Sequence, residues 1–446
     1  MRYFLILTSF FFICCRSNHA QTIDRNSLDS LFQIYDTQEL YFVNGLIKKD
    51  GKILYEQSAG FERIDKNIKS SAKTRFLIGS ISKTYTAVIM MQLVEEGKIK
   101  LDEKIDQYFP EIPNAEKITI EMLLRHRSGL HNYTSEPDFM EKVITPVSKT
   151  QFLEQFKNLA VDFTPDSTFQ YSNTNYILLG AVIEAVSEDT YANQLQLRIL
   201  DRLGLKETTL GRPEEAVSLA RSYVFRENGW EPVTPEWNTD WAWAAGGIAA
   251  TAGDVALFLE GLFGGRLITS KSLEQMTDIE EGYGLGLVTV PFRHQRFFGH
   301  TGGIEGFESL AAYNPEDGTV LVRLINGKKF YDGNEVSIQL LNGAYGHKIV
   351  FPDLTVSSES QVDVSVLNRY AGEYNAEGFP LAIKIFVEGT QLFGQATGQG
   401  AFPLKSLSNT DFEFNQAGIK MQFFEKEGKT GFKFQQATHR FEFFQK

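Results

Sequence analysis

Two serine–lysine pairs in this 446-residue chain have the spacing that a serine nucleophile and a lysine base require. Ser80 and Lys83 lie in FLIGSISKTYTAVIMMQLVEEGKI, and Ser70 and Lys73 lie shortly before them, in NIKSSAKTR. Residues three apart share one face of a helix, so the lysine amine of such a pair can take the proton of the serine hydroxyl. The residue types alone do not separate the two pairs, and their surroundings must decide.

The surroundings favour the pair at Ser80. Residues 84–94 carry no charge and predict a helix that is apolar on nearly every side, and therefore buried. Burial lowers the pKa of a lysine amine toward that of a working base, and the N-terminus of the helix directs backbone N–H groups at Ser80. The alternative is that Ser80 caps the helix and Lys83 extends into solvent. The polar, basic stretch around Ser70 is typical of a solvated turn.

A tyrosine–asparagine pair could carry the proton onward to a leaving group. Tyr171 and Asn173 lie in FQYSNTNYILLG, just before a predicted helix, so their side chains can project from a loop into a cleft. Tyr191 and Asn193 repeat this spacing at the start of an amphipathic helix. We expect Tyr191 to pack there and Asn193 to face water, and we therefore favour Tyr171.

A third motif, His300-Thr301-Gly302, lies in FFGHTGGIEGF and predicts a strand with small residues. Substrate can lie along the edge of such a strand, which offers main-chain hydrogen bonds and a backbone N–H for an oxyanion. The alternative is an ordinary strand end with a surface histidine. Lys429-Thr430-Gly431 has a similar pattern, but it falls in a charged hairpin turn, EKEGKTGF.

Strand patterns from both ends of the first 350 residues must position these motifs. Residues 40–62 predict a β-hairpin, and strands return with YGLGLVTV and with a hairpin around residues 314–318. The intervening residues, about 100–275, are mostly helical. We therefore expect an α/β (α+β) domain over residues 21–350, with an antiparallel sheet flanked by helices and a mostly helical lobe beside it. Clefts between such lobes are common sites.

The C-terminal part of the chain has a different texture. Residues 351–367 predict a polar linker, and residues 368–446 predict short strands of an all-β module, a small antiparallel barrel. We expect the repeated phenylalanines of this module to fill its core rather than to bind a ligand.

The first 20 residues predict a secretory signal peptide. Arg2 precedes an apolar run, and Ala20 is a small residue at a plausible cleavage point. A lipid anchor at Cys14 or Cys15 is the alternative. Both cysteines of the chain fall here, so the mature protein would have no disulfide and no thiolate-bound zinc. We therefore expect the protein to be secreted into a bacterial periplasm. We expect no stable membrane span after the signal peptide is removed.

The charge and the histidines restrict the partners. The formal net charge is −12 and no run of Lys or Arg stands out, which is unfavourable for nucleic acid binding. The seven histidines form no HxH or HExxH pattern, so we predict no metal and no other cofactor. The expected partner is a small-molecule or peptide substrate, and the sequence leaves the oligomeric state open.

Taken in order, the three motifs resemble those of the serine β-lactamase and penicillin-binding-protein superfamily. The likeness is greatest to the class C β-lactamase-like branch, with its esterases, D-aminopeptidases and DD-carboxypeptidases. It spans residues 25–350 and includes ITIEMLLRHRSGL, AAGGIAATAGDVALFL and YGLGLVTV. The C-terminal module, which begins NRYAGEYN, resembles the lipocalin-like domain that follows some of these hydrolases.

The resemblance implies a role for each motif. Ser80 would be the acylated nucleophile, Lys83 its base and Tyr171 the proton relay. The backbone N–H groups of Ser80 and Gly303 would form an oxyanion hole. The residues that would bind substrate are Asn173, His300, Thr301, Gly302 and Gly303. An ester, amide or lactam would acylate the serine, and water would release the acid.

The third motif departs from the β-lactamase pattern, because His300 stands where a lysine is usual. A lysine offers a fixed positive charge to a substrate carboxylate, whereas a histidine is mostly neutral at pH 7. The departure weakens the case for β-lactams and for peptides with a terminal carboxylate; histidine variants of the branch include esterases and D-amino-acid-specific aminopeptidases. Our hypothesis is a secreted serine hydrolase acylated at Ser80. The alternative is a binding or sensor protein for β-lactams or peptidoglycan fragments that acylates with little turnover.

Overall fold

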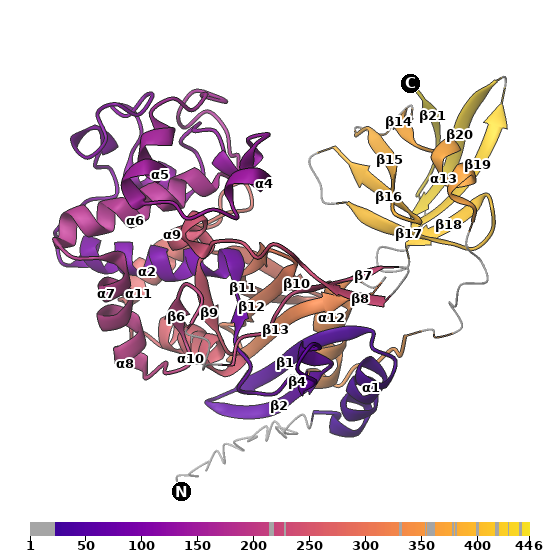
Figure 1. Ribbon diagram of the computed structural model, residues 1–446, viewed down its shortest axis with the longest axis horizontal. Coiled ribbons are helices and arrows are strands. Elements are labelled where there is room, and N and C mark those ends of the chain that lie inside the picture. The colour runs from indigo at the N-terminus through magenta and orange to yellow at the C-terminus, as the bar shows by residue number, and fades with distance from the viewer. Residues whose placement is uncertain are drawn as a thin grey trace, which may run out of the picture. The chain divides into compact units, whose positions relative to one another are not determined.

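The computed structural model describes residues 23–446, which divide into two compact units after residue 350 (Figure 1). Within residues 23–446 it leaves out a set of short stretches: 214–217, 227–228, 330–331, 353, 355–361, 377–378, 380, 398–400, 415–418, 427 and 437–438. The predicted signal peptide lies outside the described residues. None of the helices that the structure describes is both long and apolar enough to cross a membrane.

An antiparallel sheet of six strands forms the centre of the first unit, in the order β10-β11-β12-β13-β1-β2. Its strands come from both ends of the unit: β1 (Tyr41–Lys49), β2 (Lys52–Ala59), β10 (Val288–Phe292), β11 (Gln295–Ile304), β12 (Phe307–Tyr313) and β13 (Thr319–Lys328). The β1–β2 hairpin was predicted, and β1 also pairs with β13 along nearly its whole length. The sheet therefore assembles from segments far apart in the chain, as expected.

Helices cover both faces of this sheet (Figure 1). One face packs against α1 (Arg25–Thr37) and α12 (Gly333–Ala344), and the other packs against α10 (Ala252–Phe263). Alternate residues of β13 enter two separate cores, Val322 on one side and Leu321 on the other. Because both faces are buried, β13 reads as an almost continuous apolar run rather than an alternating one.

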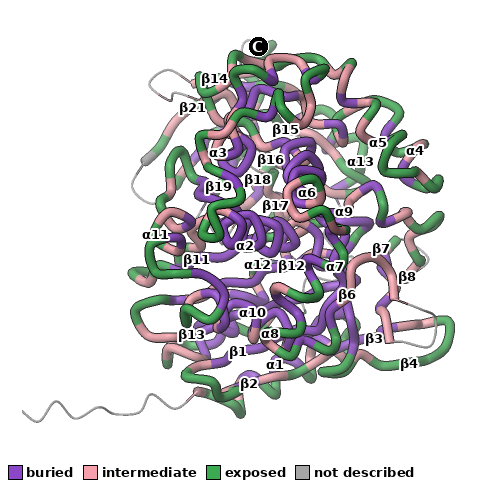
Figure 2. The backbone as a smooth tube through the Cα atoms, turned by 90° about the vertical axis from the view of Figure 1, so that its left-hand side faces the viewer, coloured by how far each residue is buried: buried purple, intermediate pink, exposed green. Residues whose placement is uncertain are grey.

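The helical lobe is built around two buried helices, α2 (Ser82–Glu95) and α6 (Asn173–Ser187), which pack against each other. Figure 2 shows both of them mostly buried. Shorter helices surround them: α3 (Ile120–Leu124), α4 (Phe139–Lys142), α5 (Lys149–Phe156), α7 (Tyr191–Leu195), α8 (Asp201–Leu203), α9 (Trp243–Gly246) and α11 (Ser270–Thr277). A π-helical turn over residues 196–200 joins α7 to α8.

Short strands join the lobe to the sheet domain. They form small two- and three-stranded sheets from seven segments: β3 (Phe61–Arg63), β4 (Ile68–Lys69), β5 (Phe76–Leu77), β6 (Thr209–Leu210), β7 (Tyr223–Arg226), β8 (Gly229–Pro232) and β9 (Ile248–Ala250). β5 pairs with β9, so the chain that leads into α2 is fixed on one side immediately before the helix begins.

The second unit is a closed antiparallel barrel preceded by α13 (Val364–Arg369). Its eight strands are β14 (Gly372–Asn375), β15 (Ile383–Glu388), β16 (Gln391–Ala396), β17 (Phe402–Ser406), β18 (Asp411–Phe414), β19 (Ile419–Lys426), β20 (Lys429–Gln436) and β21 (His439–Gln445). Pairing of β14 with β21 closes the barrel. Phe432 and Phe443 stack in its core, with ring centroids 4.8 Å apart, and the prediction of a phenylalanine-filled core is confirmed.

Candidate active site

Ser80 lies in a short 3₁₀ turn, residues Gly79–Ile81, that leads into α2. Gly79 has φ +52°, and a Cβ there would lie 2.8 Å from the backbone nitrogen of Gly303. Only glycine fits both the left-handed conformation and this close approach. The Ser80 side chain makes no capping hydrogen bond to α2, so the helix-cap alternative is wrong.

Lys83, the second residue of α2, is completely buried. Its Nζ lies 3.0 Å from Ser80 Oγ, 2.7 Å from Asn173 Oδ1 and 2.6 Å from the carbonyl oxygen of Ala245. Burial lowers the pKa of the amine well below that of an ordinary lysine. A neutral amine has two N–H donors, which match the two carbonyl oxygens, and one lone pair, which can accept the hydroxyl proton of Ser80.

Tyr171 contacts the same serine from the loop before α6. Its hydroxyl donates to Ser80 Oγ over 2.8 Å. Burial raises the pKa of the phenol, and the hydrogen bond to Ser80 opposes that rise only in part, so the phenol keeps its proton at neutral pH. Ser80 Oγ can therefore accept a hydrogen bond from Tyr171 while it donates one to Lys83.

Asn173, the first residue of α6, is fixed on both sides of its amide. Its Oδ1 accepts from Lys83, its Nδ2 donates to Thr134 Oγ1 over 3.1 Å, and its backbone N–H donates to Asn132 Oδ1 over 3.0 Å. The amide thus orients the lysine. Sequence reasoning missed Asn132 and Thr134, although both follow directly on the LLRHRSGL stretch that the resemblance rests on.

His126, in that same stretch, packs beneath Tyr171. The two ring centroids are 4.3 Å apart. The Nδ1 of His126 accepts a hydrogen bond from the backbone N–H of Ser172 over 3.2 Å, and burial lowers the pKa of the imidazole well below its usual value. A neutral ring therefore supports the phenol, and sequence reasoning did not identify His126 as part of the site.

His300 is only 4% exposed, so the surface-histidine alternative is wrong. Its Nδ1 lies 2.5 Å from the carbonyl oxygen of Thr301 and its Nε2 lies 2.8 Å from the hydroxyl of Tyr283. A carbonyl only accepts, so Nδ1 carries the proton and Tyr283 donates to Nε2. Burial, with Lys83 as the next cause, lowers the pKa of His300 to about 4, which leaves the ring neutral at pH 7. Tyr283 is a further contact that the sequence did not reveal.

The end of β11 has a free edge beside the serine. β10 pairs with β11 only as far as Gly299, so residues 300–304 have no neighbour on that side in the described sheet. Thr301 and Gly303 are exposed there. A Cβ on Gly302 would lie 2.1 Å from the carbonyl oxygen of Ile78, so the strand packs directly on the turn that carries Ser80.

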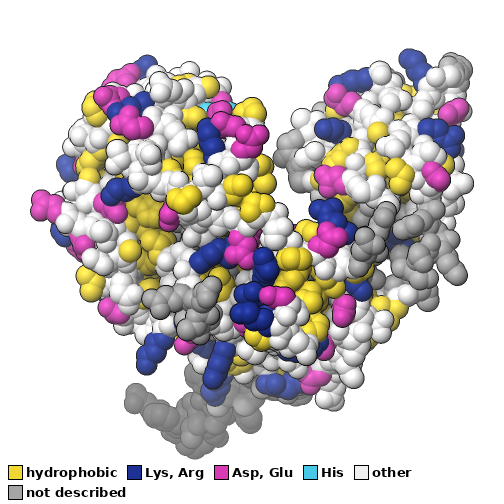
Figure 3. Space-filling view, viewed as in Figure 1, with side chains coloured by type: hydrophobic (Ala, Val, Ile, Leu, Met, Phe, Trp, Pro, Cys, Tyr) yellow, Lys and Arg dark blue, Asp and Glu magenta, His cyan; other side chains and the backbone are white. Residues whose placement is uncertain are grey.

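The three repeated patterns lie elsewhere, as predicted. Lys73 is exposed in a polar turn, and Lys429 is exposed at the start of β20. Tyr191 is buried, with its hydroxyl 2.7 Å from Thr86 Oγ1, and Asn193 faces solvent. Among the described residues on the face shown in Figure 3, acidic and basic side chains are interspersed.

Comparison with known proteins gives one family and several relatives. The family model described as Beta-lactamase matches residues 46–342. Penicillin-binding protein 4* of Bacillus subtilis (strain 168) is 24% identical over an alignment of 434 residues, and the match covers 90% of this chain and 93% of that protein. Teichoic acid D-alanine hydrolase of Staphylococcus aureus is 28% identical over 210 residues, 47% of this chain and 51% of that protein.

A solved structure of a serine hydrolase is also similar to this chain. The D-amino acid amidase from Ochrobactrum anthropi SV3, complexed with D-phenylalanine, is 26% identical in sequence, with a TM-score of 0.64. The match covers 72% of this chain and 99% of the amidase.

Proposed function

Since this chain belongs to the beta-lactamase family of serine hydrolases, we propose that it works through an acyl-enzyme formed on Ser80. One observation carries the proposal: Ser80 Oγ lies between Lys83 Nζ, at 3.0 Å, and the Tyr171 hydroxyl, at 2.8 Å. A base and a proton donor on one hydroxyl are what acyl transfer through serine requires.

Acylation begins when the neutral amine of Lys83 takes the Ser80 proton and Oγ bonds to the substrate carbonyl carbon. The carbonyl oxygen becomes an oxyanion, which the backbone N–H groups of Ser80 and Gly303 stabilise. Tyr171 then gives its proton to the leaving oxygen or nitrogen, the bond to the leaving group breaks, and the ammonium of Lys83 restores the phenol proton.

Deacylation runs the same proton transfers with water. Water loses a proton to the Tyr171–Lys83 pair as its oxygen bonds to the acyl carbon, and Ser80 leaves with a proton in return. The products are a carboxylic acid and the free serine. Asn173 holds Lys83 in place throughout both steps, since its amide is fixed by Thr134.

We propose a D-aminoacyl ester or amide as the substrate class. The relatives named for D-alanine and for D-amino acid amides support this choice. The neutral state of His300 supports it as well, because a neutral ring gives no positive charge to a substrate carboxylate. β-Lactams, which carry such a carboxylate, are expected to be poorer substrates. Export to the periplasm through the predicted signal peptide, with residues 21–350 as the hydrolase domain and 368–446 as the barrel domain, completes the proposal.

Intact mass spectrometry of the mature protein after reaction with a fluorophosphonate tests the nucleophile. One adduct is expected on the wild type and on the matched control Ser70→Ala, and none on Ser80→Ala. Labelling that persists unchanged in Ser80→Ala would overturn the proposal.

A panel of p-nitrophenyl esters, D-amino-acid p-nitroanilides and nitrocefin then tests turnover and substrate class. Turnover of D-amino-acid derivatives at higher kcat/KM than of L-amino-acid derivatives is expected. A stable adduct at Ser80 with no turnover of any compound would instead favour the sensor alternative.

A further inference from the structure

A buried acid forms the tip of the β11–β12 hairpin. Glu305 and Gly306 are the two turn residues, with φ +52° and +92°, and Ile304 pairs with Phe307 across them. Such turns prefer Asn, Asp or Gly at the first position, because other side chains are strained at positive φ. Glu305 is nevertheless 3% exposed, although carboxylates at hairpin tips normally face water.

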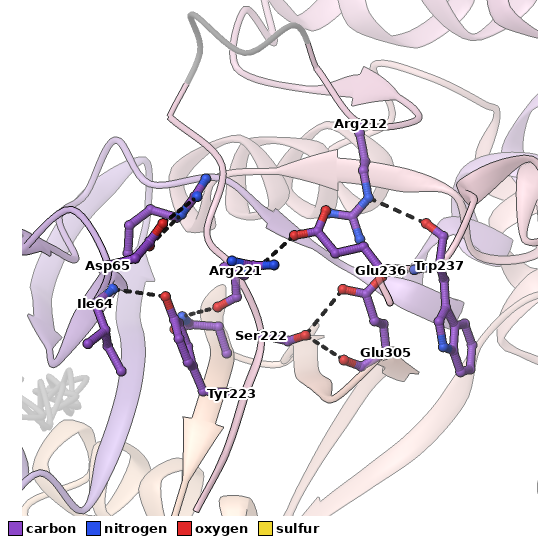
Figure 4. Close-up of polar contacts among 11 residues, drawn as sticks. Ile64, Asp65, Arg212, Arg221, Ser222, Tyr223, Glu236, Trp237 and Glu305 are labelled. Carbon is purple, nitrogen blue, oxygen red and sulfur yellow. Dashed lines mark hydrogen bonds and ion pairs between the residues drawn. The ribbon is translucent and has the colours of Figure 1, made fainter. Parts of the chain in front are cut away.

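Three groups from outside the hairpin hold the Glu305 carboxylate (Figure 4). Arg212 forms an ion pair with it, the backbone N–H of Trp237 donates over 2.6 Å, and the Ser222 hydroxyl lies 3.2 Å away. The same hydroxyl lies 2.6 Å from the carbonyl oxygen of Glu305. Burial raises the pKa of this carboxyl, and Arg212 opposes the rise.

A second layer of contacts fixes those groups in turn. Arg221 lies 3.0 Å from Glu236, and the Tyr223 hydroxyl accepts from the backbone N–H of Ile64 over 2.8 Å (Figure 4). Arg212 also lies 3.6 Å from Glu236. The hairpin tip is therefore tied to separate segments of the chain, near residues 64, 212, 221–223 and 236–237.

These contacts hold the end of β11, which has a strand partner on one side only. β10 ends its pairing at Gly299, so the end of β11 is held by β12, by the turn before α2 and by the hairpin tip. Gly303 lies two residues before Glu305, and a Cβ on Gly79 would lie 2.8 Å from its backbone nitrogen, so this part of β11 lies close to the turn that carries Ser80. A small displacement of the tip would therefore move the Gly303 N–H relative to Ser80, and displacements of about 1 Å cost large factors in rate.

We propose that Glu305, through Arg212, Ser222 and Trp237, is a positioning residue that holds the Gly303 N–H toward the oxyanion formed at Ser80. The inference rests on the proposed function, because it requires an oxyanion at this strand edge. A carboxylate that served stability alone would change the melting temperature of the protein without changing the chemistry of the folded enzyme.

Glu305→Gln removes the charge while keeping the size of the side chain and an oxygen for the Trp237 N–H. The matched control is Glu260→Gln, which breaks the ion pair between the buried Lys48 of β1 and the half-buried Glu260 of α10. Circular dichroism would check folding. Stopped-flow acylation with a p-nitrophenyl ester, and the affinity for a boronic acid that forms a tetrahedral adduct on Ser80, would read the oxyanion site.

We expect Glu305→Gln to lower the acylation rate and the boronate affinity by about 10-fold each, less than the loss of an oxyanion donor outright. KM is expected to change little. Glu260→Gln should keep wild-type values for both, although both variants should melt at lower temperature. Arg212→Lys, which keeps the charge but loses the guanidinium fork, should show a smaller loss in the same direction.

Wild-type acylation and boronate affinity in folded Glu305→Gln would overturn the inference and leave the proposed function intact. Wild-type labelling that survives in Ser80→Ala would overturn the proposed function, and the inference would fall with it. If Glu305→Gln does not fold, Arg212→Lys decides between the same two outcomes by the same measurements.

Discussion

The Ser-x-x-Lys segments at Ser70 and Ser80 share a spacing but differ in what surrounds the lysine. Lys73 is exposed in a turn, whereas Lys83 is completely buried against two carbonyl oxygens and the serine hydroxyl. The exposed amine keeps its contact with water. The buried amine has lost the hydration that favours its charged form, so it can act as a base. Burial of the lysine, more than its spacing from the serine, distinguishes the candidate base Lys83 from Lys73.

The largest effect is expected from removing each lysine in turn. Lys83→Met should lower kcat/KM for a p-nitrophenyl ester by about 10³-fold, because the serine loses its general base. Lys73→Met, the matched control, should stay within about twofold of the wild type, as surface substitutions usually do. Steady-state kinetics on both variants checks the comparison. Equal losses in the two variants would show that burial does not distinguish them.

A smaller effect is expected from the two tyrosines. Tyr171→Phe removes the proton donor on Ser80 Oγ and should lower kcat/KM by about 10²-fold with little change in stability. Tyr191→Phe removes a buried hydrogen bond to Thr86 and should cost about 1 kcal/mol of unfolding free energy, with kcat/KM unchanged. Kinetics and urea unfolding of both variants separate the roles. A kinetic defect in Tyr191→Phe alone would reverse our assignment.

The smallest effect concerns the third motif and its pH dependence. The pKa of His300 lies at about 4, below its usual value, so the ring is neutral above that pH and gains a positive charge only as the pH falls toward it. The ratio of kcat/KM for nitrocefin to that for a neutral ester should therefore stay constant between about pH 8 and about pH 6. It should rise only as the pH approaches about 4.

His300→Lys tests the effect of a positive charge at position 300 without a change of pH. A lysine that keeps its charge there should raise the nitrocefin-to-ester ratio severalfold at pH 7. An unchanged ratio in this variant, or a wild-type ratio that rises already near pH 6.5, would mean that the charge of His300 does not set the preference.

The sequence predicted the sheet and the motifs because both depend on local patterns. Apolar alternation and turn residues indicated the β1–β2 hairpin, and the apolar surroundings of Ser80 separated it from Ser70. The contact of Lys83 with Ala245 could not be predicted in this way. The acceptor is a backbone carbonyl, which any residue carries, so no side chain marks it.

Contacts across the tertiary structure were also missed or misjudged. Tyr283 reaches His300 because β10, which follows Tyr283 in the chain, pairs with β11, the strand that carries His300. The histidine is buried by packing that its neighbours in sequence do not reveal. The sequence around Glu305 did not indicate its burial either. An acid followed by a glycine, with Ile304 and Phe307 on either side, is typical of an ordinary exposed turn. Its burial depends on three segments that the fold brings together around it, which carry Arg212, Ser222 and Trp237.

Pairing of β1 with β13 has a consequence for how this protein is made. Tyr41 pairs with Lys328, so the hairpin that is synthesised first cannot complete its sheet until almost the whole first unit has left the ribosome. Until then β1, which is buried along nearly its entire length in the folded protein, has β2 and α1 beside it but lacks its second strand partner, β13, and the covering helix α12. Closing so long a loop is slow. The six-stranded sheet is therefore expected to be completed only after the helical lobe has been synthesised.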